Sequence, residues 1–80
     1  MTREEVFSRL EEVFADVFGR EVKLTDATTA ADVEDWDSLR HISLVSAVED
    51  EFDQHFPMKD VVAMKNVGDM VTLILRLEDE

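Results

Sequence analysis

Apolar residues recur at intervals of three and four positions in three stretches of this chain, and this spacing is the strongest constraint on its fold. The first stripe comprises Val6, Leu10, Val13, Phe14 and Val17. The second comprises Leu44, Val45, Val48 and Phe52, with His41 on the same side, and the third comprises Val67, Met70, Val71, Ile74 and Leu77. Such spacing places each stripe on one side of a helix. No stretch alternates with a period of two, so the sequence predicts an all-α fold.

Local signals indicate where the first helix begins and ends. Thr2 and Glu5 have the Thr-x-x-Glu spacing of a capping box, and Gly19 is a typical C-terminal stop. Residues 20–36 then form a long irregular connection, rich in residues that favour turns. We expect the apolar residues of this connection to pack against the core and anchor it there: Val22, Leu24 and Val33.

The rest of the chain reads as three further helices. The second should span about residues 37–53, and a short helical turn should follow at 58–62. Asn66 is placed to cap a last helix, whose acidic end at 78–80 is expected to fray. We therefore predict one domain over residues 1–80, with three long helices and one short helix around a single core.

Composition excludes several classes of function. The chain has 80 residues, no cysteine and a net charge of −12. Disulfide scaffolds, cysteine zinc sites and thiol nucleophiles are excluded, and no metal site is expected. The acidic excess disfavours binding to nucleic acids and anionic membranes and favours partners with basic surfaces. No signal segment or membrane span is evident, so we expect a cytoplasmic protein.

The charge is concentrated around the second helix. Residues 32–53 contain eight acids and one base, Arg40, a net charge of −7. A surface needs no such imbalance to stay soluble, which indicates a docking surface. Leu39 and Ile42 fall on the non-core side of this helix, among the acids. They resemble a small binding patch, although Leu39 could instead tuck beneath the preceding loop.

Ser38 is the residue most open to chemistry. It stands at the predicted start of the second helix, where a Ser or Asp usually accepts a hydrogen bond as the N-cap. The other interpretation is a modification site, because the free N–H groups of a helix start stabilise an attached phosphate. The local sequence alone favours the cap.

A resemblance to a known family favours the modification site over the cap. The run Asp35-Trp36-Asp37-Ser38-Leu39 and the helix after it resemble an acyl carrier protein over nearly the whole chain. In that family, Asp-Ser-Leu opens the second helix of a four-helix bundle, and a long loop separates the first two helices. The serine carries a covalent 4′-phosphopantetheine arm derived from coenzyme A. The matching core positions are Leu44, Val48 and Phe52, and residues 66–71 resemble the opening of the family's last helix.

The resemblance assigns roles to residues of the second helix. Ser38 matches the attachment serine, and Glu49 and Asp50 match acidic docking positions. The remaining residues of the implied docking face are Asp37, Leu39, Ile42 and Ser46. A phosphopantetheinyl transferase would attach the arm, and enzymes with basic surfaces would load and process acyl thioesters on it. The protein would be a monomeric carrier, not an enzyme.

Three features depart from the family pattern. Trp36 replaces a small residue, Arg40 replaces an acid or a polar residue, and residues 53–55 replace a glycine-led turn. These departures favour a specialised pathway, such as a polyketide or related secondary-metabolite route, over housekeeping fatty-acid synthesis. Trp36 is expected to pack against its own domain, with a role as partner anchor as the alternative.

The same residues fit several other functions less well. A hydrolase using Ser38 and His41 lacks a Gly-x-Ser-x-Gly elbow and an oxyanion hole. An EF-hand would need a glycine and regularly spaced acids that are absent. Met58, Met64 and Met70 could border a cavity for an acyl chain or be ordinary core. The main alternative is a small acidic interaction module without a covalent cofactor.

Overall fold

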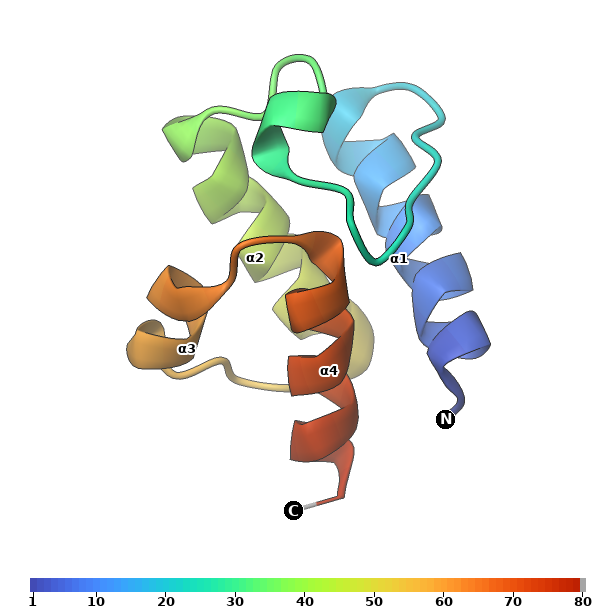
Figure 1. Cartoon of the computed structure of the whole chain (residues 1–80), viewed down its shortest axis with the longest axis vertical. Helices are drawn as coiled ribbons and strands as arrows, with labels where there is room; N and C mark the ends of the chain where they lie inside the picture. Colours follow the sequence, from blue (N-terminus) through green and yellow to red (C-terminus); the bar gives the residue numbers. More distant parts are fainter. Residues whose placement is uncertain (80) are drawn as a thin grey trace.

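The structure, a computed structural model, describes residues 1–79 and consists of four α-helices joined by loops (Figure 1). The helices are α1 (Arg3–Phe18), α2 (Ser38–Phe52), α3 (Met58–Ala63) and α4 (Val67–Glu78). A 3-10 turn, η1 (Ala30–Asp32), interrupts the long loop between α1 and α2. The described part of the chain contains no strand. The all-α fold with three longer helices and one short one is confirmed.

The helix ends follow the local signals. The Thr2 hydroxyl accepts from the Glu5 N–H at 3.1 Å, and the Glu5 carboxylate accepts from the Thr2 N–H at 3.1 Å, which completes the capping box. Gly19 ends α1 with a φ of 73°, a left-handed conformation that glycine adopts without steric cost. The Asn66 side chain accepts from the Asp69 N–H at 2.8 Å at the start of α4. The predicted boundaries of these helices are thus confirmed.

The C-terminal end is more ordered than predicted. α4 continues to Glu78, whose carboxylate forms an ion pair with the amino group of Met1. This ion pair raises the pKa of the Met1 amino group through the hydrogen bond and the charge of Glu78. The two termini accordingly lie at the same end of the molecule (Figure 1). The expected fraying is wrong for Glu78, and residue 80 lies outside the described residues.

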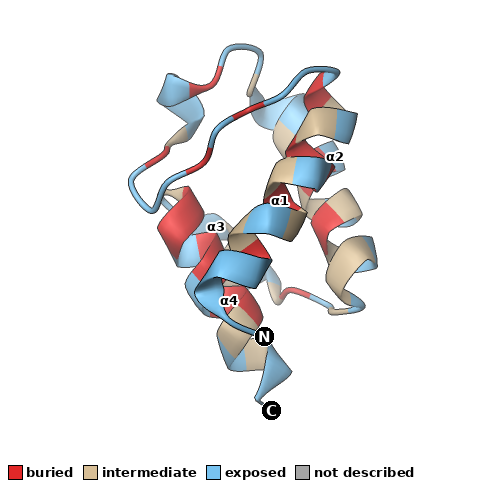
Figure 2. Ribbon diagram, turned by 90° about the vertical axis from the view of Figure 1, so that its right-hand side faces the viewer, coloured by how far each residue is buried: buried red, intermediate tan, exposed pale blue. Residues whose placement is uncertain are grey.

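The core lies between α1, α2 and α4, and α1 packs against both other helices. Figure 2 shows buried residues on the inner sides of the helices and at intervals along the long loop. The fully buried side chains are Val6, Leu10, Phe14, Leu44, Val48, Val67, Met70, Val71 and Ile74. Leu73, which lies outside the predicted stripe, is also buried, on the side of α4 that meets α3.

The long loop is fastened to the first turn of α4. The N–H of Val67 donates to the Thr28 carbonyl at 2.8 Å, and the N–H of Gly68 donates to the Asp26 carbonyl at 3.0 Å. These bonds satisfy donors that a helix start otherwise leaves free. The predicted anchors Val22, Leu24 and Val33 are all buried. The loop is therefore held along its length before it reaches α2.

Candidate functional site

Ser38 is the first residue of α2, and it does not cap the helix. The Asp37 side chain takes that role, because its Oδ1 accepts from the Arg40 N–H at 2.8 Å. Ser38 is exposed, and its hydroxyl forms no hydrogen bond with any residue of 1–79. The interpretation of Ser38 as the N-cap is therefore wrong, and its hydroxyl is available for reaction.

The surroundings of Ser38 fit a phosphoester. Neither the Ser38 N–H nor the Leu39 N–H finds an acceptor in the described part of the chain. Free N–H groups at a helix start, together with the helix dipole, stabilise a phosphate bound there. The observed site thus offers an exposed hydroxyl beside two free donors.

Arg40 fixes the start of α2 against the end of α1. Its Nη1 donates to the Val17 carbonyl at 2.8 Å, and its guanidinium lies 5.8 Å from the centre of the Phe18 ring. A cation is unfavourable in the first turn of a helix and favourable at a helix C-terminus. By reaching from α2 to α1, the Arg40 side chain meets the favourable end.

Trp36 supports the same region from within. Its ring packs edge-on against Phe14 at 5.3 Å and Phe18 at 6.2 Å between centroids. Its Nε1 donates to His41 Nδ1 at 3.1 Å, and the two rings are stacked with centroids 5.9 Å apart. Trp36 therefore packs against its own chain, as predicted. His41 is half-buried and bonded to Trp36, so Ser38 and His41 do not form the hydrogen-bonded pair that a hydrolase would use.

The predicted docking residues occupy different environments. Leu39 and Ile42 are 76% and 68% exposed, so Leu39 does not tuck beneath the loop. Asp37, Ser46 and Asp50 are also exposed. We use the term docking face for these five exposed residues: Asp37, Leu39, Ile42, Ser46 and Asp50.

Glu49 differs from the other predicted docking residues because its side chain is only 25% exposed. Its Oε2 accepts from the Phe56 N–H at 2.7 Å and lies 3.4 Å from His55 Nδ1. The carboxylate thus holds the turn after α2. The sequence reasoning also missed two large apolar side chains of α3, Met58 and Val62, which are 75% and 77% exposed.

Two hollows meet beside Ser38. One, of about 380 Å³, is bordered by Trp36, Asp37, Ser38, His41 and Ile42. The other, of about 290 Å³, lies between α2 and α3, and its borders include Val45, Phe56, Met58 and Val61. His41 and Ile42 belong to both. Of the three methionines considered for a cavity, Met58 borders the second hollow, Met64 lies between α3 and α4, and Met70 is in the core.

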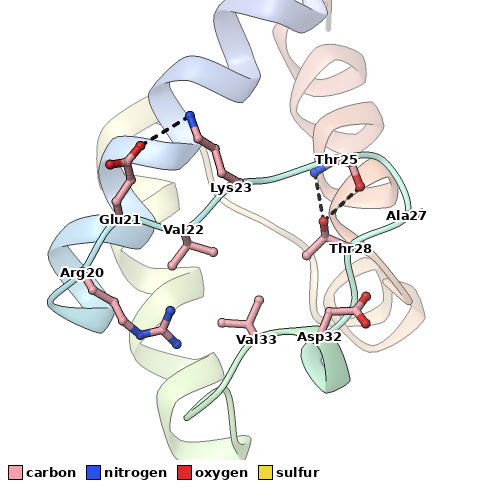
Figure 3. A pocket seen from close by; sticks show the side chains of 9 residues that line it. All are labelled: Arg20, Glu21, Val22, Lys23, Thr25, Ala27, Thr28, Asp32 and Val33. Atoms are coloured by element: carbon pink, nitrogen blue, oxygen red, sulfur yellow. Dashed lines mark hydrogen bonds and ion pairs between the residues drawn. The ribbon is translucent and has the colours of Figure 1, made fainter.

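A further hollow, of about 350 Å³, lies in the long loop, away from Ser38 (Figure 3). Its charged groups already have partners within the chain. Lys23 Nζ lies 3.4 Å from Glu21, and Arg20 Nη2 donates to the Glu34 carbonyl at 2.8 Å. The Asp32 carboxylate accepts from the Thr29 N–H. Each of its charged side chains thus has a partner within the chain, and we assign this hollow to the support of the loop.

Residues 1–79 contain neither a metal-binding cluster nor a membrane-spanning helix. No group of three or more His, Asp or Glu side chains there is arranged to hold a metal ion. No helix in that range has the length and apolar character needed to cross a membrane.

Comparison with known proteins points to one family. The family described as "Phosphopantetheine attachment site" matches residues 8–74. The chain is 32% identical to the meromycolate extension acyl carrier protein of Mycobacterium leprae, across all of this chain and 70% of that protein. It is 34% identical to an acyl carrier protein of Saccharopolyspora erythraea, across 96% of this chain and 82% of that one.

The fold agrees with a solved structure. The solution NMR structure of the holo acyl carrier protein from Geobacter metallireducens superposes with a TM-score of 0.86 at 31% sequence identity. The match covers 92% of this chain and 86% of that chain. The four-helix arrangement and the long loop before α2 are therefore features that this chain shares with a carrier in its phosphopantetheine-bearing form.

Proposed function

Since the chain belongs to the acyl carrier protein family, whose cofactor is 4′-phosphopantetheine, we propose that Ser38 is the residue that carries the arm. Members of this family are carriers of acyl intermediates and not catalysts. The family also works with partner enzymes of acyl synthesis. The proposal concerns which residue of this chain bears the cofactor and which surface those enzymes contact.

One observation carries the assignment of Ser38. Asp37 caps α2, and this leaves the Ser38 hydroxyl exposed and unbonded beside the free N–H groups of the first turn. Other serines of α2, such as Ser43 and Ser46, are exposed too, but they lie one and two turns further along the helix. There the backbone N–H groups are already used within the helix. Only the first position combines access with donors for a phosphate.

The proposed modification is a phosphoryl transfer from coenzyme A. A bond forms between Ser38 Oγ and the phosphorus that bears the pantetheine arm, and the bond from that phosphorus to the nucleotide part breaks. The nucleotide leaves as adenosine 3′,5′-bisphosphate, and the hydroxyl proton passes to a base. That base must belong to the phosphopantetheinyl transferase, because His41 is already bonded to Trp36. The transferase would also bind a divalent metal ion for this phosphoryl transfer.

The arm supplies the thiol that this cysteine-free chain lacks. Acyl groups are held on such a thiol as thioesters. A working thiol requires a compartment that keeps thiols reduced, which supports a cytoplasmic location. The chain itself would contribute the attachment point, the docking face and a framework that keeps both in place.

We propose that partner enzymes with basic surfaces contact the docking face. Its acids attract such enzymes over a distance, while Leu39 and Ile42 supply exposed apolar contacts. Contacts of this kind are fast and weaken as salt is added. The mycobacterial relatives are named for meromycolate extension, and the departures at Trp36 and Arg40 likewise support a specialised route.

Intact-mass measurement tests the attachment site. The purified chain is incubated with coenzyme A and a phosphopantetheinyl transferase of broad specificity, and a gain of one phosphopantetheine is expected. Ser38→Ala should abolish the gain, while the matched variants Ser43→Ala and Ser46→Ala should retain it. No gain with several transferases, or a gain that survives Ser38→Ala, would show that Ser38 is not the site.

The docking face is tested by reversing one charge at a time. Asp50→Lys should slow loading at low salt, and the difference from the native chain should shrink as salt rises. Glu12→Lys changes the charge equally on an exposed position of α1 and serves as the control. Equal loading rates for both variants at low salt would contradict the proposed face.

A further inference from the structure

We propose that His41 is a binding residue for the group attached to Ser38, and that its Nε2–H donates a hydrogen bond to an oxygen of that group. This inference rests on the proposed attachment at Ser38. The recognised chemistry is an oxygen acceptor, which could belong to the arm or to the acyl chain that the arm bears. The argument depends on the tautomer, the orientation and the position of one imidazole.

The bond from Trp36 sets the tautomer of His41. Because Trp36 Nε1 can only donate, His41 Nδ1 must accept, and it does so at 3.1 Å. In the neutral imidazole the proton then resides on Nε2. Within residues 1–79, this Nε2 has no hydrogen-bond partner. His41 thus presents a donor that the chain itself leaves unused.

The orientation of His41 is fixed as well as its tautomer. The imidazole stacks on the Trp36 ring at an interplanar angle of 22°, and Trp36 is itself wedged edge-on against Phe14 and Phe18. Phe14 is fully buried in the core. A chain of ring contacts therefore connects the imidazole to the interior, and little freedom remains for it to turn away.

The position of His41 places this donor beside the space that a group attached to Ser38 can occupy. His41 borders both the hollow beside Ser38 and the hollow between α2 and α3, so a group that extends from Ser38 toward α3 through these hollows passes it. The walls around it are largely apolar, including Ile42, Val45 and Phe56. In such surroundings an attached group that offers no acceptor would deprive the donor of water without replacing the bond. An attached group with an oxygen at this point is favoured for that reason.

Two sources of the oxygen are chemically equivalent for the imidazole. The arm contains amide carbonyls and a hydroxyl, whereas the acyl chain contains its thioester carbonyl and, in oxidised chains, keto or hydroxyl groups. If the acceptor is on the acyl chain beyond the thioester, His41 selects oxygenated over saturated cargo. If it is on the arm, His41 holds the arm along α2 whatever the cargo.

NMR spectroscopy of the imidazoles tests the proposal, because the chain has only two histidines. Spectra of the imidazole nitrogens and their protons are recorded for four forms of the protein. These forms are the unmodified chain, the chain with the arm alone, and the chain loaded with a saturated acyl group or with a β-keto acyl group of equal length. Intact mass confirms loading of each form beforehand, so a failure to load counts against Ser38 and not against His41.

The expected result is a downfield shift of the His41 Nε2 proton and its slower exchange with water in at least one modified form. A change that appears with the arm alone identifies the arm as the source, and one confined to the β-keto form identifies the cargo oxygen. A change shared by both loaded forms identifies the thioester carbonyl. Unchanged His41 signals in every form would overturn the proposal, as would a shift of His55 without His41.

Trp36→Phe provides a second measurement on the same residue. This variant keeps an aromatic ring but removes the N–H that sets the tautomer, so the two His41 nitrogen resonances should move toward each other. The protection of the Nε2 proton in the modified protein should decrease at the same time. If the protection remains at the native level, Trp36 does not position His41 and that part of the proposal is wrong.

Discussion

α4 and α2 are amphipathic helices of similar length, but the structure uses them very differently. α4 buries six of its twelve residues, and these lie against α1, the long loop and α3: Val67, Gly68, Met70, Val71, Leu73 and Ile74. α2 buries only Leu44 and Val48 among its fifteen residues. Both have an apolar stripe, so the stripe alone does not show how much of a helix is covered. α4 is a structural support, while α2 leaves most of its residues exposed or partly exposed.

The starts of the helices show the same contrast. The third residue is an acid in α1 and α4, Glu5 and Asp69, where it accepts a backbone N–H near the cap. In α2 the third residue is Arg40, whose side chain bonds to the end of α1. In α4 the first two N–H groups, those of Val67 and Gly68, are bonded to the long loop, so its first turn is closed. The first turn of α2 leaves the N–H groups of Ser38 and Leu39 free, and α1, despite its capping box, likewise leaves those of Arg3 and Glu4 without an acceptor in residues 1–79.

The largest expected effect compares the same substitution in the two helices. Ile74→Ala removes a fully buried side chain from α4 and should lower the free energy of unfolding by about 2–5 kcal/mol. Ile42→Ala removes a side chain of α2 that is 68% exposed, and it should change the free energy of unfolding by no more than about 0.5 kcal/mol. Urea titration followed by circular dichroism measures both. Similar losses for the two variants would contradict the division between support and free surface.

The second prediction concerns the contact between the long loop and α4. A Cβ at residue 68 would lie 2.7 Å from the Asp26 carbonyl oxygen, so Gly68→Ala must displace the loop. We expect a loss of about 1–3 kcal/mol in unfolding free energy. Gly19→Ala is the matched control, because it meets no neighbour within 4 Å and costs only about 1 kcal/mol for its left-handed backbone. A Gly68→Ala loss no greater than that of Gly19→Ala would show that the loop yields easily.

The sequence predicts what is decided within three or four residues. The capping box at Thr2, the glycine stop at Gly19 and the cap at Asn66 each depend on neighbours along the chain, and all three are observed. The burial of most stripe residues also follows from spacing alone. For this reason the helices were predicted well.

The sequence does not predict contacts between distant segments. The Arg40 bond to Val17 and the Gly68 contact with Asp26 each depend on how two elements meet in space. Leu73 lies off the stripe and is buried only because α3 packs nearby. At the site, the position of Ser38 was evident, but the competition that left its hydroxyl free was not. Both Asp37 and Ser38 are good caps, and only the backbone geometry selects Asp37.

The third prediction compares the caps of α4 and α2. Asn66→Ala and Asp37→Ala each remove a side chain that accepts one N–H of the first turn, so each should lower the unfolding free energy by about 1 kcal/mol. Only Asp37→Ala should also slow attachment of phosphopantetheine, because it disorders the turn that presents Ser38. Unfolding titrations and the rate of mass gain separate the two effects. Equal attachment rates in both variants would mean that the geometry of this turn is unimportant for the transferase.

The smallest effect is expected at the capping box of α1. Hydrogen bonds from the Thr2 backbone and hydroxyl lower the pKa of Glu5 from its ordinary value of 4.5. A carboxylate whose pKa is lowered in the folded protein stabilises the fold at pH values above its ordinary pKa. That contribution is lost as the pH falls through the lowered pKa. Glu5→Gln keeps a capping side chain without the charge, so the variant should be slightly less stable than the native chain at neutral pH.

This difference should begin to close as the pH falls to 4.5 and should vanish below the lowered pKa of Glu5. Amide hydrogen exchange in the first turn of α1 measures it locally, with the first turn of α2 as the internal reference. Glu4→Gln removes an equal charge from the same turn, outside the capping box, and serves as the control. If Glu5→Gln differs from the native chain equally at all pH values, its effect comes from shape rather than charge. The capping box of α1 would then owe its stability to the Thr2 hydrogen bonds alone, and its contrast with the start of α2, where Arg40 occupies the third position, would be independent of ionisation.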